Sequence, residues 1–518
     1  MSSIVDEGET MENIIVKMNH ISKSFGSVKA LNKVNLELFK GEVHSLLGEN
    51  GAGKSSLMNI LSGIYMPDEG ELSIKGKDLV LRSPKDAIDL GIGMIHQHFK
   101  LVEVLTAKEN IIAGYNKGIF VKHEELSKKI KETSAKYGLE IDPDKKVYNM
   151  SVAEKQRVEI LKVLYRGADI LILDEPTAVL TPQETEGLFD IVRNMTKHGC
   201  AVVIITHKLN EVMEISDKIT ILRKGESIRT VLKEETDVNE LTELMVGRAV
   251  DLSIQRAPLG KRKKVMEIKN MTVLNFDKTK AVDNISFDML SGEILGVAGI
   301  AGSGQKELCE SLAGLMHIHS GDVIYRGNSL KGKNPADIIR MGISMSFVPE
   351  DRLGMGLVGS MDIVDNVLLK EYQKTIGFML KKRTSKEKAQ TIVDALNIST
   401  PSTDKHPVKL LSGGNIQKVL LGREIAANPE VIITAYPSRG LDIGSSMLVY
   451  DLLNEQKQKE VAILYIGEDL DVLMELCDRI MVLYNGTITG IVDAKTSTRE
   501  QLGLLMSGVV EDNLDENS

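Results

Sequence analysis

The chain carries one sequence plan twice, and this duplication restricts its fold more than any other feature. Residues 41–48 (GEVHSLLG) match residues 292–299 (GEILGVAG), and residues 217–225 (DKITILRKG) match residues 478–486 (DRIMVLYNG). Between these stretches, residues 148–157 match 409–418, and residues 173–177 match 434–438. Matches in the same order over this distance indicate two related domains, which suits a chain of 518 residues.

The limits of the two domains follow from the matches. We expect a first domain at 13–249, a linker at 250–264 and a second domain at 265–508, with frayed polar tails at 1–12 and 509–518. The linker contains a run of Lys and Arg that we interpret as solvated. Within each copy, short Val- and Ile-rich runs alternate with helical patterns, which favours an α/β fold with a mainly parallel sheet.

The two copies differ in length. Lys54 aligns with Gln305, 251 residues later, and Ser151 aligns with Ser412, 261 residues later. The second copy therefore carries about ten extra residues between these points. We expect them in the Lys-, Thr- and Ser-rich region 375–408.

The composition excludes several classes of protein. Lys and Arg number 64 against 73 Asp and Glu, and the net charge of −9 argues against bulk nucleic-acid binding. The acidic N-terminal stretch lacks the apolar segment of a signal peptide, and the longest apolar runs are far too short for a membrane span. Cys200, Cys309 and Cys477 form no C-x-x-C motif and are expected to be buried in a reducing compartment. We expect a cytoplasmic protein, so any membrane role must come through partners.

The first copy contains the pattern G-x-x-x-x-G-K-[ST] at residues 48–55, between a short apolar run and a helical pattern. Glycines let the backbone turn tightly and bring N–H groups against phosphate oxygens, and the following helix points its positive end at the same anion. Lys54 can reach the β- and γ-phosphates, and the Ser55 hydroxyl can bind Mg²⁺. The expected phosphate-binding residues are Gly48, Glu49, Asn50, Gly51, Ala52, Gly53, Lys54, Ser55 and Ser56.

Three further sites in the first copy carry side chains suited to nucleotide binding or hydrolysis. Asp174 and Glu175 end an apolar strand, where one acid can hold Mg²⁺ through water and the other can take a proton from an attacking water. An Asp-Glu-Pro sequence standing alone is equally explained as a loop cap. His207 ends another apolar strand, where it could help to place the water or serve as a surface imidazole. The ring of Phe25 could stack on adenine or pack in the core.

Several motifs of the first copy occur in the same order as in a known family of domains. The loop at 48–55, Gln97, the segment 151–157, Leu-Asp-Glu-Pro-Thr at 173–177 and Ile-Thr-His at 205–207 are similar to an ATP-binding cassette (ABC) domain. The resemblance covers 13–508 as two cassettes, and it implies a P-loop NTPase fold with a mainly parallel sheet core, an antiparallel β subdomain and a helical subdomain. It implies ATP and Mg²⁺ as ligands. It implies Phe25 as the adenine-stacking ring, Gln97 as the link between Mg²⁺ and a membrane partner, Asp174 as the metal-binding acid, Glu175 as the general base and His207 as the switch histidine.

The second copy is similar to one group within this family. Residues 299–305, 347–352, 411–417 and 439–442 resemble the fused twin-cassette ATPases of bacterial simple-sugar and nucleoside importers, and Gly-Gln at 304–305 favours the nucleoside branch. The resemblance implies two integral membrane permease subunits, an extracytoplasmic solute-binding protein and pairing of the two cassettes within the chain. It also implies a peripheral position on the cytoplasmic face of the membrane. No nucleic-acid partner is expected.

The second copy departs from the first at every reacting position. The replacements are Gln305 for Lys54, Lys306 for Ser55, Ala435 for Asp174, Tyr436 for Glu175, Glu350 for Gln97 and Glu468 for His207. An amide cannot supply the lost cation, and neither a metal-binding acid nor a base remains. We expect that the second copy does not hydrolyse ATP by the same chemistry.

The signature motif of the second copy is nevertheless intact. It comprises Ser412, Gly413, Gly414 and Asn415 and is followed by Asp442, whereas the first copy reads Ser-Val-Ala-Glu at 151–154 and is explained by a capping box. In the family, each ATP lies between the P-loop of one cassette and the signature of the other. The resemblance therefore implies one complete composite site, formed by the first P-loop and residues 412–415, and one degraded site.

Two other functions remain open at this point. A soluble twin-cassette ATPase acting on ribosomes or nucleic acid would usually have two intact sites and a long basic helical linker, unlike this chain. A non-hydrolytic nucleotide-binding scaffold would not need Glu175 and His207. The apolar run 99–105 is either a docking surface for a membrane partner, beside Gln97 and Glu350, or ordinary core.

Overall fold

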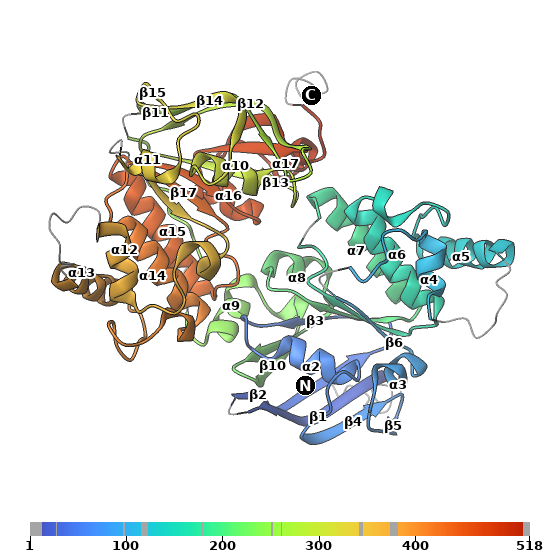
Figure 1. Cartoon of the computed structure of the whole chain (residues 1–518). Helices are drawn as coiled ribbons and strands as arrows, with labels where there is room; N and C mark the ends of the chain where they lie inside the picture. Colours follow the sequence, from blue (N-terminus) through green and yellow to red (C-terminus); the bar gives the residue numbers. More distant parts are fainter. Residues whose placement is uncertain are drawn as a thin grey trace. The chain divides into compact units, whose positions relative to one another are not determined.

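The chain folds into two compact units, Met1–Asp251 and Leu252–Ser518. The computed structural model, drawn in Figure 1, describes residues 13–26, 28–96, 99–114, 123–178, 180–249, 252–260, 262–340, 345–372 and 382–510. Residues 1–12 and 511–518, which form most of the expected tails, lie outside the described residues. No helix in the described ranges is long and apolar enough to cross a bilayer.

The core of the first unit is a six-stranded sheet in the order β10-β9-β3-β8-β7-β6. Five neighbouring strands of this sheet are parallel: β6, β7, β8, β3 and β9. The sixth strand, β10, pairs antiparallel with β9. The apolar runs VHSLL of β3 and AVVII of β8 are buried at every position, as expected for strands covered on both faces. The strands are β3 (Val43–Leu47), β6 (Ile92–Ile95), β7 (Ile170–Asp174), β8 (Ala201–Ile205), β9 (Lys218–Arg223) and β10 (Glu226–Leu232).

A second, antiparallel sheet in the order β2-β1-β4-β5 packs on helix α2 and the parallel sheet through a shared apolar cluster. Burial alternates along β2, so one face of this sheet lies on the core and the other faces solvent. The strands are β1 (Ile14–Phe25), β2 (Val28–Phe39), β4 (Glu69–Ile74) and β5 (Lys77–Asp78), and α2 is Lys54–Leu61.

The remaining helices of the first unit form a separate layer and the outer cover. Helices α4, α5 and α6 pack on one another, and Figure 1 shows them grouped away from the antiparallel sheet. The helices are α3 (Pro84–Asp89), α4 (Ala107–Ile112), α5 (His123–Tyr137), α6 (Val152–Tyr165), α7 (Pro182–Lys197), α8 (Leu209–Ile215) and α9 (Val238–Val246). The predicted parallel core, antiparallel β subdomain and helical subdomain are therefore confirmed in this unit.

The second unit repeats the plan. Its sheets run β20-β19-β13-β18-β17-β16 and β12-β11-β14-β15, with the same parallel and antiparallel pairings. The strands are β11 (Lys264–Leu274), β12 (Lys280–Leu290), β13 (Glu293–Gly299), β14 (Ile318–Tyr325), β15 (Asn328–Ser329), β16 (Met345–Val348), β17 (Val431–Ala435), β18 (Ala462–Ile466), β19 (Arg479–Tyr484) and β20 (Thr487–Asp493). The helices are α10 (Gln305–Leu312), α11 (Pro335–Arg340), α12 (Ile363–Glu371), α13 (Lys382–Ala395), α14 (Gly413–Ile425), α15 (Ile443–Gln458), α16 (Leu470–Leu476) and α17 (Arg499–Met506).

The extra residues of the second copy are not gathered in 375–408, and that expectation is wrong. Strand β16 begins 253 residues after β6, so two extra residues precede it. Asn110 Oδ1 accepts a hydrogen bond from Val102 N, and Asn366 Oδ1 accepts the matching one from Val358 N, 256 residues later. Three more extra residues therefore lie at the π-helical turn Arg352–Gly356, and five remain for the region after Asn366.

Residues 252–260 of the expected linker lie against the second unit. The backbone N–H of Ala257 donates to Asn454 Oδ1 at 2.9 Å, and Lys457 Nζ donates to Ala257 O at 2.6 Å. The same ammonium forms an ion pair with Asp478 at 2.7 Å, and both side chains are almost fully buried. This segment is thus fixed by hydrogen bonds to its own unit.

Candidate functional site

The loop 48–53 follows β3 and is pressed against neighbouring backbone, which explains two of its glycines. A Cβ on Gly48 would lie 2.3 Å from Leu222 O on β9. Gly53 has φ 104°, and its Cβ would lie 2.7 Å from Ala30 O on β2. Both contacts are with backbone atoms that cannot move aside. The loop therefore curls tightly before α2, as a phosphate-binding loop requires.

Lys54 begins α2 and turns back over this loop. Its Nζ donates to Gly48 O at 2.5 Å and to Glu49 O at 3.1 Å, and only 7% of the residue is exposed. Burial lowers the pKa of the ammonium, while the nearby carboxylates of Glu175 and Asp174 act in the opposite direction. The end of β7 thus lies close enough to the loop for its two acids to act on the same cation.

The two acids at the end of β7 differ in environment. Burial, and then the neighbouring charge of Glu175, raise the pKa of Asp174. The hydrogen bond from His207 lowers the pKa of Glu175, which keeps that carboxylate ionised and able to accept a proton. Glu175 also has φ 46°, a left-handed conformation that is uncommon for a residue with a side chain.

His207 follows β8 and faces Glu175. Its Nδ1 lies 3.1 Å from Glu175 Oε1, and its side chain is 54% exposed. Two side chains that the sequence places at the ends of separate strands thus meet at one edge of the sheet. The imidazole can fix the direction of the carboxylate while its other nitrogen remains available to a ligand.

The side chains present fit a divalent cation. The hydroxyl of Ser55 is exposed at the start of α2, and Asp174 supplies a carboxylate whose charge the surrounding protein compensates poorly. Oxygen donors of this kind suit Mg²⁺. Gln97, the third predicted ligand, lies outside the described residues together with His98.

Phe25, at the end of β1, does not pack in the core. Its ring is 43% exposed and meets Tyr65 edge-on, with the ring centroids 5.2 Å apart. Lys23 Nζ lies 5.8 Å from the centre of the Phe25 ring. The core-packing alternative is therefore wrong. Sequence reasoning missed Tyr65, which stands 11 residues after Lys54 outside any motif.

In the second unit the loop 299–304 keeps the shape of its counterpart. A Cβ on Gly299 would lie 2.6 Å from Leu483 O, and Gly304 has φ 99°. The buried amide of Gln305 donates to Ile300 O at 3.0 Å, as Lys54 donates to Glu49 O. The loop 299–304 therefore has the same backbone conformation as the loop 48–53, although Gln305 supplies no positive charge in place of Lys54.

One family of known proteins matches both copies. The family described as "ABC transporter" matches residues 31–178 and 282–436, which is more than half of the chain. The chain belongs to the ABC transporter family. It is therefore an ATPase built of two cassettes, and the predicted family and fold are confirmed.

Its full-length relatives are ATP-binding subunits. The chain is 43% identical to the nucleoside import ATP-binding protein NupA of Lactococcus lactis, over 95% of this chain and 98% of the relative. It is 42% identical to the guanosine import ATP-binding protein NupO of Bacillus subtilis, over 95% and 97%. It is 36% identical to the glucose import ATP-binding protein TsgD13 of Haloferax volcanii, over 95% and 96%.

The signature of the second cassette, with its two glycines, forms the tightly packed start of α14. Ser412 caps α14 and its Oγ accepts from Asn415 Nδ2 at 3.0 Å. A Cβ on Gly414 would lie 3.1 Å from Ser445 Oγ and 3.4 Å from Asp442 Oδ2, so the helix start packs tightly on the cap of α15. Asp442 caps that helix by accepting from Ser445 N at 2.8 Å.

The matching stretch of the first cassette is a capping box, as predicted. Glu154 Oε2 accepts from Ser151 N at 2.8 Å, and Ser151 Oγ accepts from Glu154 N at 3.2 Å. Lys145 forms an ion pair with Glu154 at 2.7 Å. The side chains at this helix start are thus engaged with one another.

The second cassette also contains an ion-pair network that sequence reasoning missed. Arg439 forms an ion pair with Glu350 and another with Glu468, the latter at 3.2 Å. Its guanidinium carbon lies 5.9 Å from the centre of the Tyr436 ring. In the first cassette the corresponding position is Ala178. An arginine and two carboxylates therefore lie around Tyr436, at the position that corresponds to Glu175 in the first cassette.

Proposed function

We propose that this chain energises the import of nucleosides by hydrolysing ATP. The proposal rests on identities of 43% and 42% to a nucleoside and a guanosine import protein, against 36% to a glucose import protein, all at full length. Cargo contacts belong to the membrane and solute-binding subunits. Uptake of labelled guanosine, uridine, glucose and galactose by reconstituted vesicles tests the cargo, and saturable uptake of a sugar without nucleoside uptake would contradict it.

Hydrolysis takes place at one composite site, formed by the P-loop of the first cassette and residues 412–415 of the second. Glu175 accepts a proton from the water that attacks the γ-phosphorus, and ADP and inorganic phosphate are released. His207 holds the carboxylate of Glu175 in place. Lys54 and the loop N–H groups bind the β- and γ-phosphates, and Phe25 stacks on the adenine. Closure and reopening of the two cassettes drive the membrane subunits.

Mg²⁺ accompanies the nucleotide. Ser55, Asp174 and Gln97 would hold it, the aspartate through water. When bound, the ion neutralises charge on the phosphate oxygens. The half-buried carboxylate of Asp174, whose pKa burial raises, supports this assignment because a cation nearby would offset its charge.

The partners are two permease subunits and an extracytoplasmic solute-binding protein, and the chain lies on the cytoplasmic face of the membrane. Apolar side chains near the end of β6 support a docking surface. Val102 and Val104 are 50% and 65% exposed, so this part of 99–105 is not core. Leu353 and Met355, after β16 in the second cassette, are 37% and 46% exposed. The two cassettes comprise residues 13–249 and 265–508, and residues 250–264 link them.

One contrast carries the single-site proposal. The first cassette has Glu175 against His207, whereas the second has Tyr436 beside an ion-pair network. Lys54→Ala should abolish ATP turnover by the assembled transporter, and Gln305→Ala should leave most of it. Equal loss from these two substitutions would contradict a single hydrolytic site.

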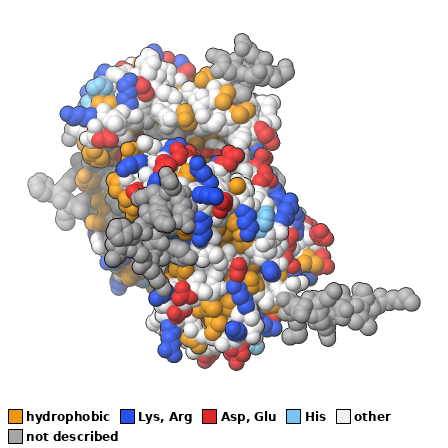
Figure 2. Space-filling view, turned by 90° about the vertical axis from the view of Figure 1, so that its right-hand side faces the viewer, with side chains coloured by type: hydrophobic (Ala, Val, Ile, Leu, Met, Phe, Trp, Pro, Cys, Tyr) orange, Lys and Arg blue, Asp and Glu red, His pale blue; other side chains and the backbone are white. Residues whose placement is uncertain are grey.

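A protein acting on ribosomes or nucleic acid is the less favoured function. On the face seen in Figure 2, the described Lys and Arg side chains are interspersed with Asp and Glu, which gives no extended basic surface there. The full-length relatives are import proteins.

A further inference from the structure

The turn that follows β16 in the second cassette is fastened along helix α14. This π-helical turn, Arg352–Gly356, is the place where three extra residues of the second copy lie. The carbonyl of Gly356 accepts a hydrogen bond from Arg423 Nη2 at 2.7 Å, and a Cβ on Gly356 would lie 2.9 Å from Leu420 Cδ2. Both partners belong to α14. The turn therefore has a fixed position beside the helix that carries the signature.

The first residue of the turn, Arg352, reaches the start of that helix. A Cβ on Gly413, the first residue of α14, would lie 3.6 Å from Arg352 Nη1. Arg352 Nη2 donates to Arg439 O, in the loop between β17 and α15. The same loop ends in Asp442, which packs against Gly414. The guanidinium thus lies where the signature and this loop meet.

No acidic group of the described residues pairs with this guanidinium. The bond to Arg439 O is the one hydrogen bond found for it in the described part of the chain. Burial lowers the pKa of Arg352. The neighbouring Arg439, by contrast, forms ion pairs with Glu350 and Glu468. Arg352 is therefore a partly dehydrated cation that keeps donors for an anion from outside.

The start of α14 adds to this positive potential. A helix N-terminus carries a partial positive charge, and the first turn of α14, which the structure describes fully, contains no Asp or Glu. Ser412 and Asn415 bond to each other there as neutral groups. The start of α6 in the first cassette instead carries Glu154, which is paired with Lys145 at 2.7 Å. The second signature is thus suited to an anion, whereas the matching helix start of the first cassette holds its own carboxylate.

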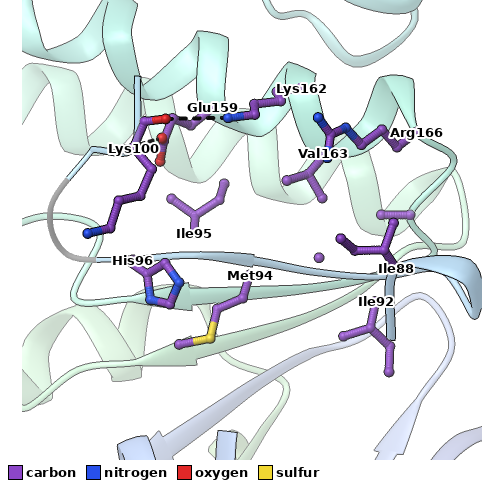
Figure 3. Close-up of a pocket in the computed structure, with 12 residues that line it drawn as sticks. Ile88, Ile92, Met94, Ile95, His96, Lys100, Glu159, Lys162, Val163 and Arg166 are labelled. Atoms are coloured by element: carbon purple, nitrogen blue, oxygen red, sulfur yellow. Dashed lines mark hydrogen bonds between the residues drawn. The ribbon is translucent and has the colours of Figure 1, made fainter. Parts of the chain in front are cut away.

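The first cassette also uses its cations after β6 differently. Lys100 N donates to Glu159 Oε1 at 2.5 Å, and Lys162 Nζ donates to Lys100 O at 3.4 Å. Figure 3 shows these three residues at a cavity of about 240 Å³ between β6 and α6. Burial raises the pKa of Glu159, and the hydrogen bond from Lys100 and the charges of both lysines act in the opposite direction. These lysines therefore lie at a carboxylate in the middle of α6, and the cation at the signature is a feature of the second cassette.

We infer that Arg352 is a further nucleotide-binding residue of the proposed composite site, where its guanidinium donates to the terminal phosphate of the ATP held by the first P-loop. The inference rests on the proposed function, because it needs the pairing of that P-loop with residues 412–415. The loop 48–53 and Lys54 bind the phosphates from their own side, so a cation that arrives with the signature meets the outermost one. ADP lacks this phosphate. Arg352 therefore adds to the preference of the site for ATP over ADP.

Equilibrium binding to the assembled transporter tests the inference. Glu175→Gln is the background, because it prevents hydrolysis, and unlabelled ATP or ADP competes with a fluorescent ATP analogue. Arg352→Gln should weaken ATP binding about tenfold and leave ADP binding unchanged. Arg352→Lys should recover part of the loss, since it restores the charge without the planar fork. Arg383→Gln removes an arginine that is 92% exposed on α13 of the same cassette and is the control.

Two further measurements separate a phosphate contact from a purely structural role. The ATP affinity of the Arg352→Gln protein should fall less steeply with added KCl than that of the background, because one cation–phosphate attraction has been removed. Arg352→Lys should restore the steeper dependence. In a Lys54→Ala background, Arg352→Gln should cause no further loss of ATP binding, because both residues act on the nucleotide of the first P-loop.

Three results would overturn the inference. They are an unchanged ATP affinity in Arg352→Gln, an equal loss of ATP and ADP affinity, and a loss with an unchanged salt dependence. Ser412→Ala tests the proposed function separately. If Ser412→Ala lowers turnover while Arg352→Gln leaves ATP affinity unchanged, the inference fails and the composite site stands. If neither substitution has an effect, the pairing of the first P-loop with residues 412–415 fails as well.

Discussion

In the first cassette, Nδ1 of His207 and Oε1 of Glu175 lie 3.1 Å apart across the ends of the adjacent parallel strands β7 and β8. The hydrogen bond lowers the pKa of Glu175. The same two positions of the second cassette hold Glu468 and Tyr436, whose side chains cannot form this pair. At these positions a carboxylate paired with an imidazole is therefore found in the first cassette and not in the second.

Substitution of the base should separate the two cassettes. Glu175→Gln should lower the rate of phosphate release by about 10²–10⁴-fold, because an amide cannot accept the proton of the attacking water. Tyr436→Phe is the matched change and should leave the rate unaltered. Steady-state phosphate release by the assembled transporter measures both, and similar losses would show that Glu175 has no special role.

The pH dependence of turnover should report the imidazole. In His207→Ala the pKa of Glu175 should rise toward its usual value, because the hydrogen bond that lowers it is gone. The acid limb of the pH–rate profile should then move to higher pH. An unchanged acid limb, with only a lower maximum rate, would mean that His207 acts on the nucleotide rather than through Glu175.

The two signature serines offer a matched pair. Ser412→Ala and Ser151→Ala each remove a helix N-cap, so each should lower the free energy of unfolding by about 1 kcal/mol. Only Ser412→Ala should also lower ATP turnover, by about 10–100-fold, because it removes a hydrogen bond to the nucleotide in the proposed composite site. Equal effects on turnover would contradict the pairing of the first P-loop with residues 412–415.

The network around Arg439 should contribute to stability. In Arg439→Ala the carboxylates of Glu350 and Glu468 lose their shared cation, and the free energy of unfolding should fall by about 1 kcal/mol because both ion pairs are partly exposed. Adding Glu350→Gln and Glu468→Gln should recover part of the loss by removing two negative charges that no longer share the Arg439 cation. Denaturant unfolding monitored for each variant gives the comparison, and no recovery would assign the loss to packing.

His44 should make the stability of the first cassette depend on pH. It is buried on β3, bonded to Thr220 Oγ1 at 2.8 Å, and burial lowers its pKa from 6.5 to about 3. Below pH 6.5 the His44 imidazole is protonated in the unfolded chain but stays neutral in the folded chain. The free energy of unfolding should therefore fall by about 1.4 kcal/mol per pH unit from about pH 6.5 down to about pH 3.

The second cassette supplies the control for this prediction. Leu295 and Met481 stand at the positions of His44 and Thr220, and both are buried. The double variant His44→Leu, Thr220→Met should lose this component of the slope while keeping the packing. Denaturant unfolding between pH 4 and pH 8 measures the difference, and parallel slopes for both proteins would contradict a buried neutral His44.

Local patterns predicted the parts of the site that depend on neighbouring residues. The glycine-rich loop before α2 and the capping box at Ser151 both follow from spacings of a few positions, and both are found. Duplication of the motifs also predicted two similar domains. These signals need no knowledge of distant contacts.

Contacts between distant residues could not be predicted in the same way. Arg439 and Glu350 lie in separate motifs that do not show their pairing, and with Glu468 they become neighbours only when three strand ends meet at one edge of the sheet. Tyr65 meets Phe25 across 40 residues. The prediction placed the extra residues of the second copy in the wrong region because it used composition. Composition shows where insertions are tolerated, but it does not show where the second copy departs from the hydrogen bonds of the first.

The backbone at the end of β17 has the same unusual conformation as the backbone at the end of β7. Tyr436 has φ 49°, close to the 46° of Glu175, although an aromatic side chain gains nothing from a left-handed conformation. The two cassettes therefore carry different side chains on the same backbone conformation. Giving the second cassette the side chains of the first is therefore a matter of exchanges on an existing scaffold, at Gln305, Lys306, Glu350, Ala435, Tyr436 and Glu468, together with glycines at Val152 and Ala153 in the signature that is proposed to face it.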